Sequence, residues 1–281
     1  VRLVHLRGEL FDSVKGGGML SVPLAAEELK RRLPEGLDLA TVNAPELCVA
    51  SGPKAAIEAF RESLAAEEIE AQPVAIDIAA HSRMLEPILG RFEAFLRTID
   101  LRSPRIPVVS NRSGTWLQDA EAKDPLYWAR HLRETIQFAA GISTLAEDRS
   151  RVYIEVGPGK VLSSLVKAHG AVDANQVINS LRHPDEAVDD SLFFLTALGR
   201  AYATGAAVEI RKLWKSEQQR RLPLPAYAFQ HQRYFLDPVA AAPAELADAP
   251  LMKIPEVANW GYRPAWKQRL ADVFPDADRA A

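Results

Sequence analysis

Cysteine is almost absent from this 281-residue sequence, which contains only Cys48. A single cysteine excludes an intramolecular disulfide framework and is typical of proteins in a reducing compartment. Cys48 lies in an apolar, strand-like run, so we predict a small core residue rather than a nucleophile. The sequence also lacks a signal peptide and any apolar run long enough to span a bilayer. We therefore expect a cytoplasmic protein with no membrane partner.

An excess of charge of either sign is also missing, because 34 Lys and Arg residues accompany 37 Asp and Glu residues. The formal net charge of -3 argues against nucleic acid as the main ligand, since nucleic-acid-binding domains carry basic patches. The composition, 48% hydrophobic and 25% charged, predicts one large core and a smaller second one. The sequence begins with Val1 inside a helical pattern, so we expect a piece of a longer polypeptide.

Residues 18–76 alternate between strand and helix patterns. The predicted order is a strand at 19–22, a helix at 23–33, strands at 37–42 and 47–50, a helix at 53–67 and a strand at 70–76. This βαββαβ order is typical of a ferredoxin-like unit. We predict a compact inserted subdomain whose two ends, Gly18 and Ile76, lie close together.

The flanking segments, 1–17 and 77–190, have an α/β pattern and form the predicted large subdomain. It combines helices that end near Phe11 or begin near His81 and Asp124 with strands at 106–110 and 152–156. A glycine turn at 157–160 then leads into a helix at 161–168. The turn is too short for a phosphate-binding loop and lacks its spacing, which excludes a nucleotide site. A tight turn that needs glycine at positive φ is the favoured explanation.

The organisation becomes looser after residue 190. An amphipathic helix at 191–204 begins a predicted linker that continues to residue 238 and includes a proline- and aromatic-rich stretch at 222–236. The alanine- and proline-rich stretch at 240–249 predicts a flexible linker. Residues 259–266 are too aromatic for a linker and predict the first strand of a following domain, so 239–281 is assigned to these two parts.

The stretch 76–84 places a histidine where a short apolar strand meets the start of a helix. Small residues, Ala79 and Ala80, precede His81, and Ser82 can cap the helix that follows. A histidine at such a corner is well placed to act as a general base. On these residues alone, a partly buried structural histidine is the commoner explanation.

Short motifs along residues 1–238 add to this interpretation through their order. They lie at residues 6–8, 18–22, 42–45 with 51–52, 80–82, 109–111, 127–133, 155–159 and 222–234. Their order and spacing resemble the acyltransferase domain of modular (type I) polyketide synthases and the linker that follows it. That family is related to malonyl-CoA:acyl carrier protein transacylase. The resemblance implies an α/β-hydrolase-like large subdomain with an inserted ferredoxin-like small subdomain.

The resemblance also implies a ping-pong acyl transfer through a serine, from a coenzyme A thioester to the phosphopantetheine thiol of an acyl carrier protein. His81 matches the base, Arg7 matches the arginine that pairs with the free carboxylate of a malonyl-type extender, and His131 matches a backbone carbonyl that orients the base. Ala80, Ser82 and Asn111 would line the substrate site. The implied partners are the carrier protein, a neighbouring ketosynthase and a downstream domain, with no bound cofactor or metal.

One departure from the family pattern is large, because no Gly-x-Ser-x-Gly sequence occurs in these residues. The nucleophile and its oxyanion-hole amides would lie elsewhere, so we expect the chain alone not to complete a turnover. Ala80 stands where the family often has phenylalanine in malonyl-type enzymes and serine in methylmalonyl-type enzymes. The extender therefore stays open, with room beside its α-carbon for a branch.

Two other functions compete with acyl transfer. One is a non-catalytic scaffold on which a carrier protein docks, and the other is a hydrolase that clears acyl groups from carriers. Arg7 argues against the hydrolase, because a buried guanidinium would make no favourable contact with a neutral acyl chain. The scaffold stays open, since the serine is not in these residues.

Overall fold

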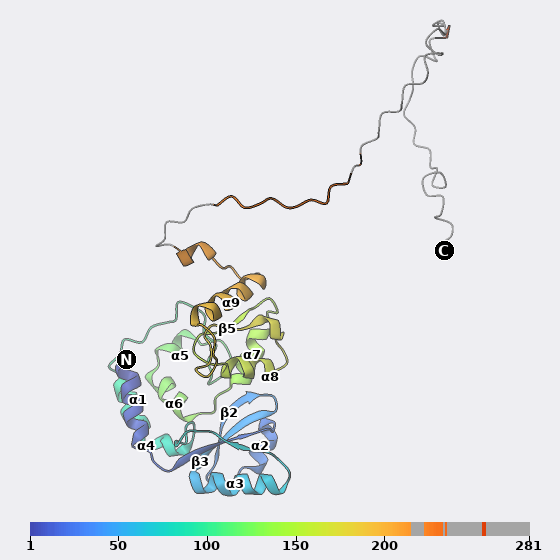
Figure 1. Cartoon of the computed structure of the whole chain (residues 1–281). Helices are drawn as coiled ribbons and strands as arrows, with labels where there is room; N and C mark the ends of the chain where they lie inside the picture. Colours follow the sequence, from blue (N-terminus) through green and yellow to red (C-terminus); the bar gives the residue numbers. More distant parts are fainter. Residues whose placement is uncertain (215–221, 233, 235–254, 257–281) are drawn as a thin grey trace. The chain divides into compact units, whose positions relative to one another are not determined.

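A computed structural model describes residues 1–214, 222–232, 234 and 255–256 of the chain (Figure 1). Contacts divide the chain into two units, Val1–Glu217 and Gln218–Ala281. In the second unit, residues 222–232 form no helix or strand, and Tyr227 and Phe229 are exposed with ring centroids 4.9 Å apart. The predicted linker at 240–249 and the predicted strand within 259–266 lie outside the described residues.

The small subdomain is a four-stranded antiparallel sheet with two helices. The strands are β1 (Gly17–Val22), β2 (Asp38–Ala44), β3 (Leu47–Pro53) and β4 (Gln72–Pro73), and the helices are α2 (Ala26–Arg32) and α3 (Lys54–Ala66). The strand order is β2-β3-β1-β4, which confirms the predicted ferredoxin-like arrangement. Strand β4 is shorter than the predicted 70–76, because Pro73 has no N–H to donate to a longer ladder.

The two faces of this sheet have different partners. On one face, Leu20, Cys48 and Phe60 belong to a buried cluster that packs α2 and α3 against the strands. On the other face, Met19 and Val49 form a smaller cluster with the segment that leads to His81. The alternation of side chains along each strand therefore leaves one face for the helices and the other for the large subdomain.

The ends of the small subdomain lie side by side. The Val74 amide donates a hydrogen bond to the Met19 carbonyl at 3.0 Å, just beyond the short β1–β4 pairing. Gly17 is buried at this joint, and a Cβ at its position would stand 2.2 Å from the amide nitrogen of Ala79. The absence of a side chain at Gly17 therefore lets β1 pass directly beneath the chain that carries His81.

We expect Gly17→Ala to destabilise the protein, because the added methyl must displace the Ala79 backbone. Overpacking of this kind costs about 1–3 kcal/mol in the free energy of unfolding. Gly18→Ala is the matched control, since its Cβ would meet Lys54 at an ordinary 3.6 Å. That variant should be neutral or stabilised by up to about 1 kcal/mol. Urea unfolding of both variants measures the difference, and equal midpoints would contradict this account.

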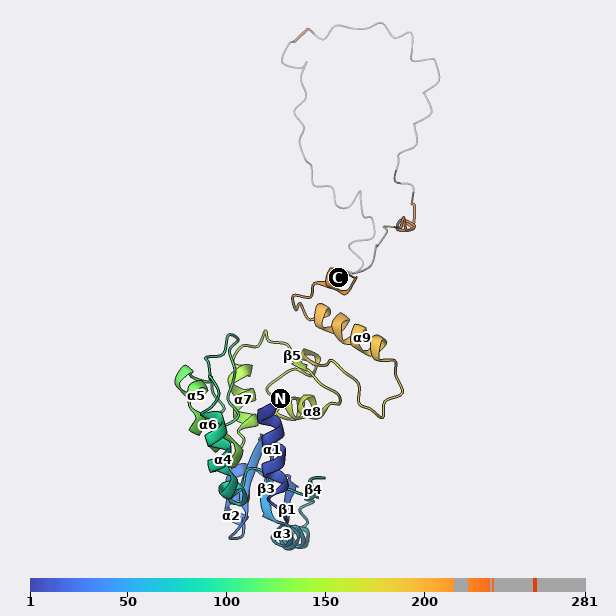
Figure 2. The ribbon, with the colours of Figure 1, turned by 90° about the vertical axis from the view of Figure 1, so that its left-hand side faces the viewer.

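Helices form the first half of the large subdomain. They are α1 (Arg2–Asp12), the 3-10 turn η1 (Arg83–Leu85), α4 (Glu86–Leu96), α5 (Asp119–Lys123) and α6 (Pro125–Arg133). Leu10, Leu85 and Phe92 are buried in one cluster, so α1 packs against η1 and α4, and α1 lies beside α4 in Figures 1 and 2. Leu132 brings α6 into the same cluster. These contacts set the positions of Arg7 and His131.

A two-stranded parallel sheet organises the second half. Its elements are α7 (Phe138–Ala146), β5 (Tyr153–Glu155), α8 (Val161–Ala168), η2 (Ala174–Gln176), β6 (Val177–Asn179), α9 (Asp190–Ala203) and η3 (Ile210–Trp214). Helix α9, the first part of the predicted linker, packs Ala197 and Ala201 against Ile178 of β6. No helix in the described residues is long and apolar enough to cross a membrane.

Two strands predicted from apolar runs do not form. Residues 76–79 make turns instead, and Ile76 donates to the Val74 carbonyl at 2.7 Å while its side chain is exposed. The run at 106–110 forms only one isolated bridge, from Val109 to Trp116. Pro107 interrupts that run and cannot donate to a ladder, which explains why the apolar pattern misled the prediction.

Candidate active site

His81 stands in a strained backbone conformation at the start of η1. Its φ is 57°, in the left-handed region that residues with a side chain rarely adopt. Ala79 is fully buried before it, and Ala80 packs on the Met19 and Val49 face of the small-subdomain sheet. Such strain persists only where the surrounding packing enforces it, and it concentrates at functional sites.

A backbone carbonyl fixes the orientation of the imidazole. Nδ1 of His81 lies 3.1 Å from the carbonyl oxygen of Glu134. A carbonyl only accepts hydrogen bonds, so Nδ1 carries the hydrogen and Nε2 keeps its lone pair. The neutral side chain is therefore held in the tautomer that a general base requires.

The resemblance implies that the His131 backbone orients the imidazole, and the structure adds a second carbonyl, that of Glu134, at hydrogen-bonding distance from Nδ1. Helix α6 ends at Arg133, and Glu134 has an extended backbone with φ -81° and ψ 158°. Its carbonyl lies beyond the last turn of α6, whose final carbonyls have no partner within the helix. The His131 backbone lies near enough to raise the pKa of His81, as the Glu134 carbonyl does.

Burial and, to a smaller extent, the neighbouring His131 lower the pKa of His81 to about 4. The two rings meet edge to face with centroids 6.3 Å apart. Burial also lowers the pKa of His131, as does the positive charge of Arg112. Both imidazoles are therefore neutral at neutral pH, and the His131 side chain takes part in the electrostatics of the site.

We expect the His81 imidazole to titrate near pH 4 in NMR spectra of the chain, against about 6.5 for an unfolded histidine. Between these values the unfolded chain binds a proton that the folded chain does not. The free energy of unfolding should therefore fall as the pH drops from about 6.5 to about 4, and this contribution is fully present only above that window. Urea unfolding of the wild type and His81→Gln measures the pH-dependent difference. A titration midpoint near 6.5 would contradict the burial of the ring.

The side chain of Glu134 forms an ion pair with Arg112. No sequence pattern indicates this pair. The Glu134 carboxylate accepts two hydrogen bonds from the Arg112 guanidinium, one of them at 3.1 Å from Nη2. The guanidinium also lies over the Tyr127 ring, 4.7 Å from its centroid. Arg112 lies in an irregular turn, 22 residues before Glu134, so no helical or strand periodicity relates the two residues.

Arg7 lies on α1 and is exposed rather than buried as the sequence argument assumed, and its guanidinium stands 5.8 Å from the centroid of the Phe11 ring. No carboxylate of the described residues lies within ion-pairing distance of it. Arg7 and His131 border the same hollow of about 320 Å³, whose other walls are apolar. His131 therefore contacts His81 on one side and shares this hollow with Arg7 on the other. The hollow is lined by Leu3, Val4, Arg7, Phe92, Leu96, Leu101, Trp128, His131 and Leu132.

The other predicted substrate-binding residues have structural contacts. Ser82 is fully buried, and its hydroxyl donates to the Ala79 carbonyl at 2.8 Å and accepts from the Met84 amide at 3.3 Å. Ser82 thus caps η1, as its position in the sequence predicts. Asn111 is exposed, and its carbonyl accepts a hydrogen bond from the Gln137 amide at 2.6 Å.

Two other reactive-looking features have structural explanations. Burial raises the pKa of the Cys48 thiol to about 11, which makes it an inert core residue. At the glycine turn, Gly159 has a φ of 93°. The Glu155 carboxylate accepts the amides of Leu162 and Ser163 at 3.1 and 2.9 Å, so it occupies the start of α8 where an anion would bind.

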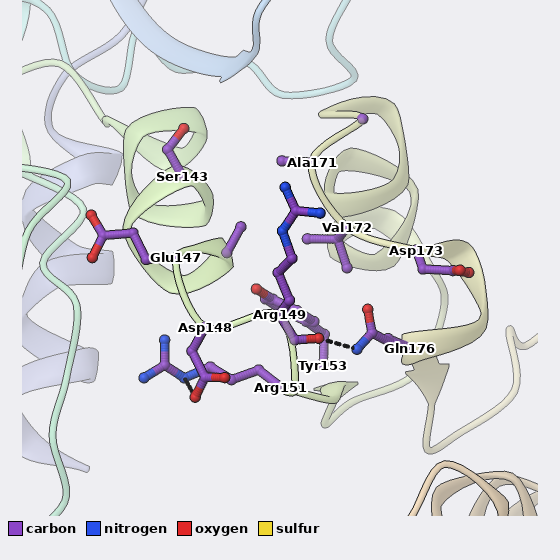
Figure 3. Close-up of a pocket in the computed structure, with 12 residues that line it drawn as sticks. Ser143, Glu147, Asp148, Arg149, Arg151, Tyr153, Ala171, Val172, Asp173 and Gln176 are labelled. Carbon is purple, nitrogen blue, oxygen red and sulfur yellow. Dashed lines mark hydrogen bonds and ion pairs between the residues drawn. The ribbon is translucent and has the colours of Figure 1, made fainter.

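A hollow of about 520 Å³ lies between the end of α7 and the turn before η2, and none of the predicted site residues borders it (Figure 3). The Arg149 side chain extends into this space. Arg151 is engaged by Asp148 at 3.7 Å and by the Leu145 carbonyl at 2.7 Å. Three carboxylates border the hollow against two guanidiniums, so its charge does not favour an anion. In the described part of the chain, no cluster of metal-ligating side chains could hold an ion.

Comparison with known proteins decides the family. The family described as acyl transferase domain matches residues 1–208, about three quarters of the sequence. The chain belongs to the acyl transferase domain family. The match covers α1, the small subdomain, His81 and the sheet formed by β5 and β6.

Polyketide synthases are among the relatives of this acyl transferase domain. A phenolphthiocerol/phthiocerol polyketide synthase of Mycobacterium tuberculosis is 33% identical over 242 residues, which are 85% of this chain and 16% of that protein. Polyketide synthase GfsB of Streptomyces halstedii is 36% identical over 252 residues, 88% of this chain and 4% of that protein. The chain thus spans a small part of these relatives.

A solved structure shows the same fold. The acyl transferase domain of ZmaA superimposes with a TM-score of 0.73 at 36% identity, over 80% of this chain and 52% of that domain. The chain therefore spans about half the length of that structure. The predicted α/β acyltransferase fold is confirmed by this similarity.

Proposed function

We propose that this chain is the part of a polyketide synthase acyltransferase that selects a malonyl-type extender from its coenzyme A thioester and transfers it to the phosphopantetheine thiol of an acyl carrier protein. The observation that carries the proposal is the arrangement around His131. One side of this residue contacts His81, whose Nε2 is free to accept a proton, and the other borders the hollow that Arg7 also lines.

His81 acts as the base in both half-reactions. Nε2 takes the proton of a serine hydroxyl as the serine oxygen attacks the thioester carbonyl, and the coenzyme A thiolate leaves and takes this proton from the imidazolium. In the second half-reaction, Nε2 takes the proton of the pantetheine thiol, whose sulfur attacks the acyl-serine ester. The serine oxygen leaves and regains its proton from the imidazolium. Coenzyme A and phosphopantetheine are substrates here and not bound cofactors.

Arg7 holds the free carboxylate of the extender. A guanidinium binds a carboxylate through two parallel hydrogen bonds, and no protein carboxylate of the described residues competes for it. The apolar walls of the hollow, such as Leu101 and Trp128, suit a branch on the acyl α-carbon. A carboxylate anion bound beside the two neutral imidazoles also favours the imidazolium that forms during each attack.

The proposal assigns the nucleophile to a serine outside these 281 residues, because no Gly-x-Ser-x-Gly sequence occurs within them. The chain then supplies the base and the carboxylate anchor, and the serine and oxyanion hole come from elsewhere in the same synthase. A neighbouring ketosynthase and a downstream domain complete the proposed set of partners.

The test is the fate of a labelled malonyl group in the synthase module that contains this chain, followed by mass spectrometry. We expect the group to appear on the serine and then on the carrier protein. Rapid release of free malonate from a loaded carrier would instead identify a hydrolase. No labelling of the serine, with the carrier still bound, would identify a docking scaffold.

A further inference from the structure

We propose that the Arg112–Glu134 ion pair is a positioning device that holds the His81 imidazole in its Nδ1–H tautomer. The inference rests on the proposed function for its catalytic meaning, because His81 must present a free Nε2 to act as the base. The pair touches neither substrate nor reacting atoms. It acts by keeping the Glu134 carboxylate away from the imidazoles, so that the Glu134 carbonyl remains the acceptor of the Nδ1 hydrogen bond at 3.1 Å.

Glu134 is the joint between a helix and a fixed extended segment. Its amide donates to the Arg130 carbonyl at 2.8 Å, which closes the last turn of α6. Two residues later, the Ile136 amide donates to the Ala40 carbonyl at 2.8 Å, and the Val42 amide donates to the Ile136 carbonyl at 2.8 Å. The segment after Glu134 is thereby fixed to the edge of β2, while the Glu134 side chain is free to turn unless Arg112 holds it.

Arg112 is itself held firmly enough to serve as the anchor. Its amide donates to Ser110 Oγ at 3.1 Å, and that oxygen also hydrogen-bonds the Tyr127 hydroxyl. Tyr127 is buried in α6, and its ring lies beneath the Arg112 guanidinium. The Arg112 backbone is thus held by Ser110, and its guanidinium stacks on the Tyr127 ring and donates two hydrogen bonds to the Glu134 carboxylate.

Without Arg112, the Glu134 carboxylate becomes a competing acceptor beside the imidazoles. A carboxylate oxygen accepts hydrogen bonds more strongly than a carbonyl does. The released side chain can then accept a ring hydrogen from either imidazole and draw the His81 hydrogen away from the Glu134 carbonyl. The structure prevents this competition by pairing both carboxylate oxygens with Arg112.

His131 and Glu134 at the end of α6 and Arg112 in the turn after residue 110 act on the imidazoles. A further ion pair, Asp38–Arg83, joins β2 to η1. Removing Arg112 would change the His81 pKa in two opposing directions. A liberated carboxylate raises the pKa, and a lost carbonyl hydrogen bond lowers it. The tautomer is therefore the informative property.

The experiment records 15N chemical shifts of the histidine rings at pH 7 in the full 281-residue chain, with His81 assigned through His81→Gln. The wild type should show Nδ1 protonated and Nε2 unprotonated in His81. Arg112→Ala should convert at least about a third of the population to the Nε2–H form, which water favours. The exchanged pair, Arg112→Glu with Glu134→Arg, should restore the wild-type shifts because it rebuilds the ion pair.

Arg97→Ala is the matched control, because it breaks a comparable Arg–Glu pair with Glu93 on α4. Its His81 shifts should match the wild type. An unchanged tautomer in Arg112→Ala would overturn the proposal, as would failure of a folded exchanged pair to restore it. Arg112→Gln keeps the inference testable if Arg112→Ala does not fold, because it keeps a polar side chain and removes the charge that holds the carboxylate. This variant should show the same conversion to the Nε2–H form, and an unchanged tautomer would overturn the proposal. None of these results depends on acyl transfer, so they are separate from the test of the proposed function.

Discussion

His81→Ala should reduce acyl transfer in the synthase module by about a hundredfold or more, within the range that general base catalysis contributes. The loss follows from geometry, because no second imidazole can take over the role. His131 borders the hollow with Arg7. Its ring packs edge to face against the His81 ring and does not occupy the position of that ring. The measurement is the rate at which the carrier protein acquires the labelled acyl group.

His183→Ala is the control for this first prediction, because His183 is exposed and lies in the loop after β6. Its acyl transfer rate should match the wild type. Near-normal loading of the carrier protein by His81→Ala, in a protein that still unfolds cooperatively, would remove His81 from the mechanism.

Arg7→Ala should invert the preference between acidic and neutral acyl groups. Hydrogen bonds to charged groups contribute about 1.5–3 kcal/mol each, so malonyl or methylmalonyl loading should fall by at least about tenfold. Acetyl-CoA and propionyl-CoA never make the contact, and their loading should stay constant or rise. Removing the guanidinium leaves an apolar wall that no longer presents a charge to a neutral group.

Arg2→Ala tests whether any loss of positive charge on α1 has the same effect, since Arg2 is exposed on that helix. It should leave both loading rates unchanged. The informative quantity is the ratio of malonyl to acetyl loading in each variant. Equal losses for both substrates in Arg7→Ala would mean that Arg7 supports the fold and does not contact the carboxylate.

The local pattern of apolar residues and turns was sufficient to predict the small subdomain from the sequence. Alternating apolar residues and the breaks at 34–36 and 43–45 located every strand except the shortened β4. The strand order β2-β3-β1-β4 then follows from the ferredoxin-like arrangement. The same pattern failed at 106–110, where apolar residues precede an irregular turn and only one bridge forms.

The candidate site was predicted only as far as single residues allow. The small residues before His81 indicated a corner, but no sequence pattern specified the positive φ of His81. The Glu134 carbonyl was not predicted beside the His131 backbone, because its position depends on where α6 ends and on the extended backbone of Glu134. The Arg112–Glu134 pair joins residues from two irregular segments, which no periodicity in the sequence can relate.

One measurement tests the proposed roles of His81 and Arg7 together. It is the crystal structure of the serine-containing acyltransferase loaded with a malonyl group. We predict that His81 Nε2 lies within hydrogen-bonding reach of the serine oxygen, about 2.6–3.2 Å, while Nδ1 keeps the Glu134 carbonyl. The malonyl carboxylate should meet the Arg7 guanidinium through two hydrogen bonds. An Nε2 that faces away from the serine, or a carboxylate bound by another residue, would contradict the account.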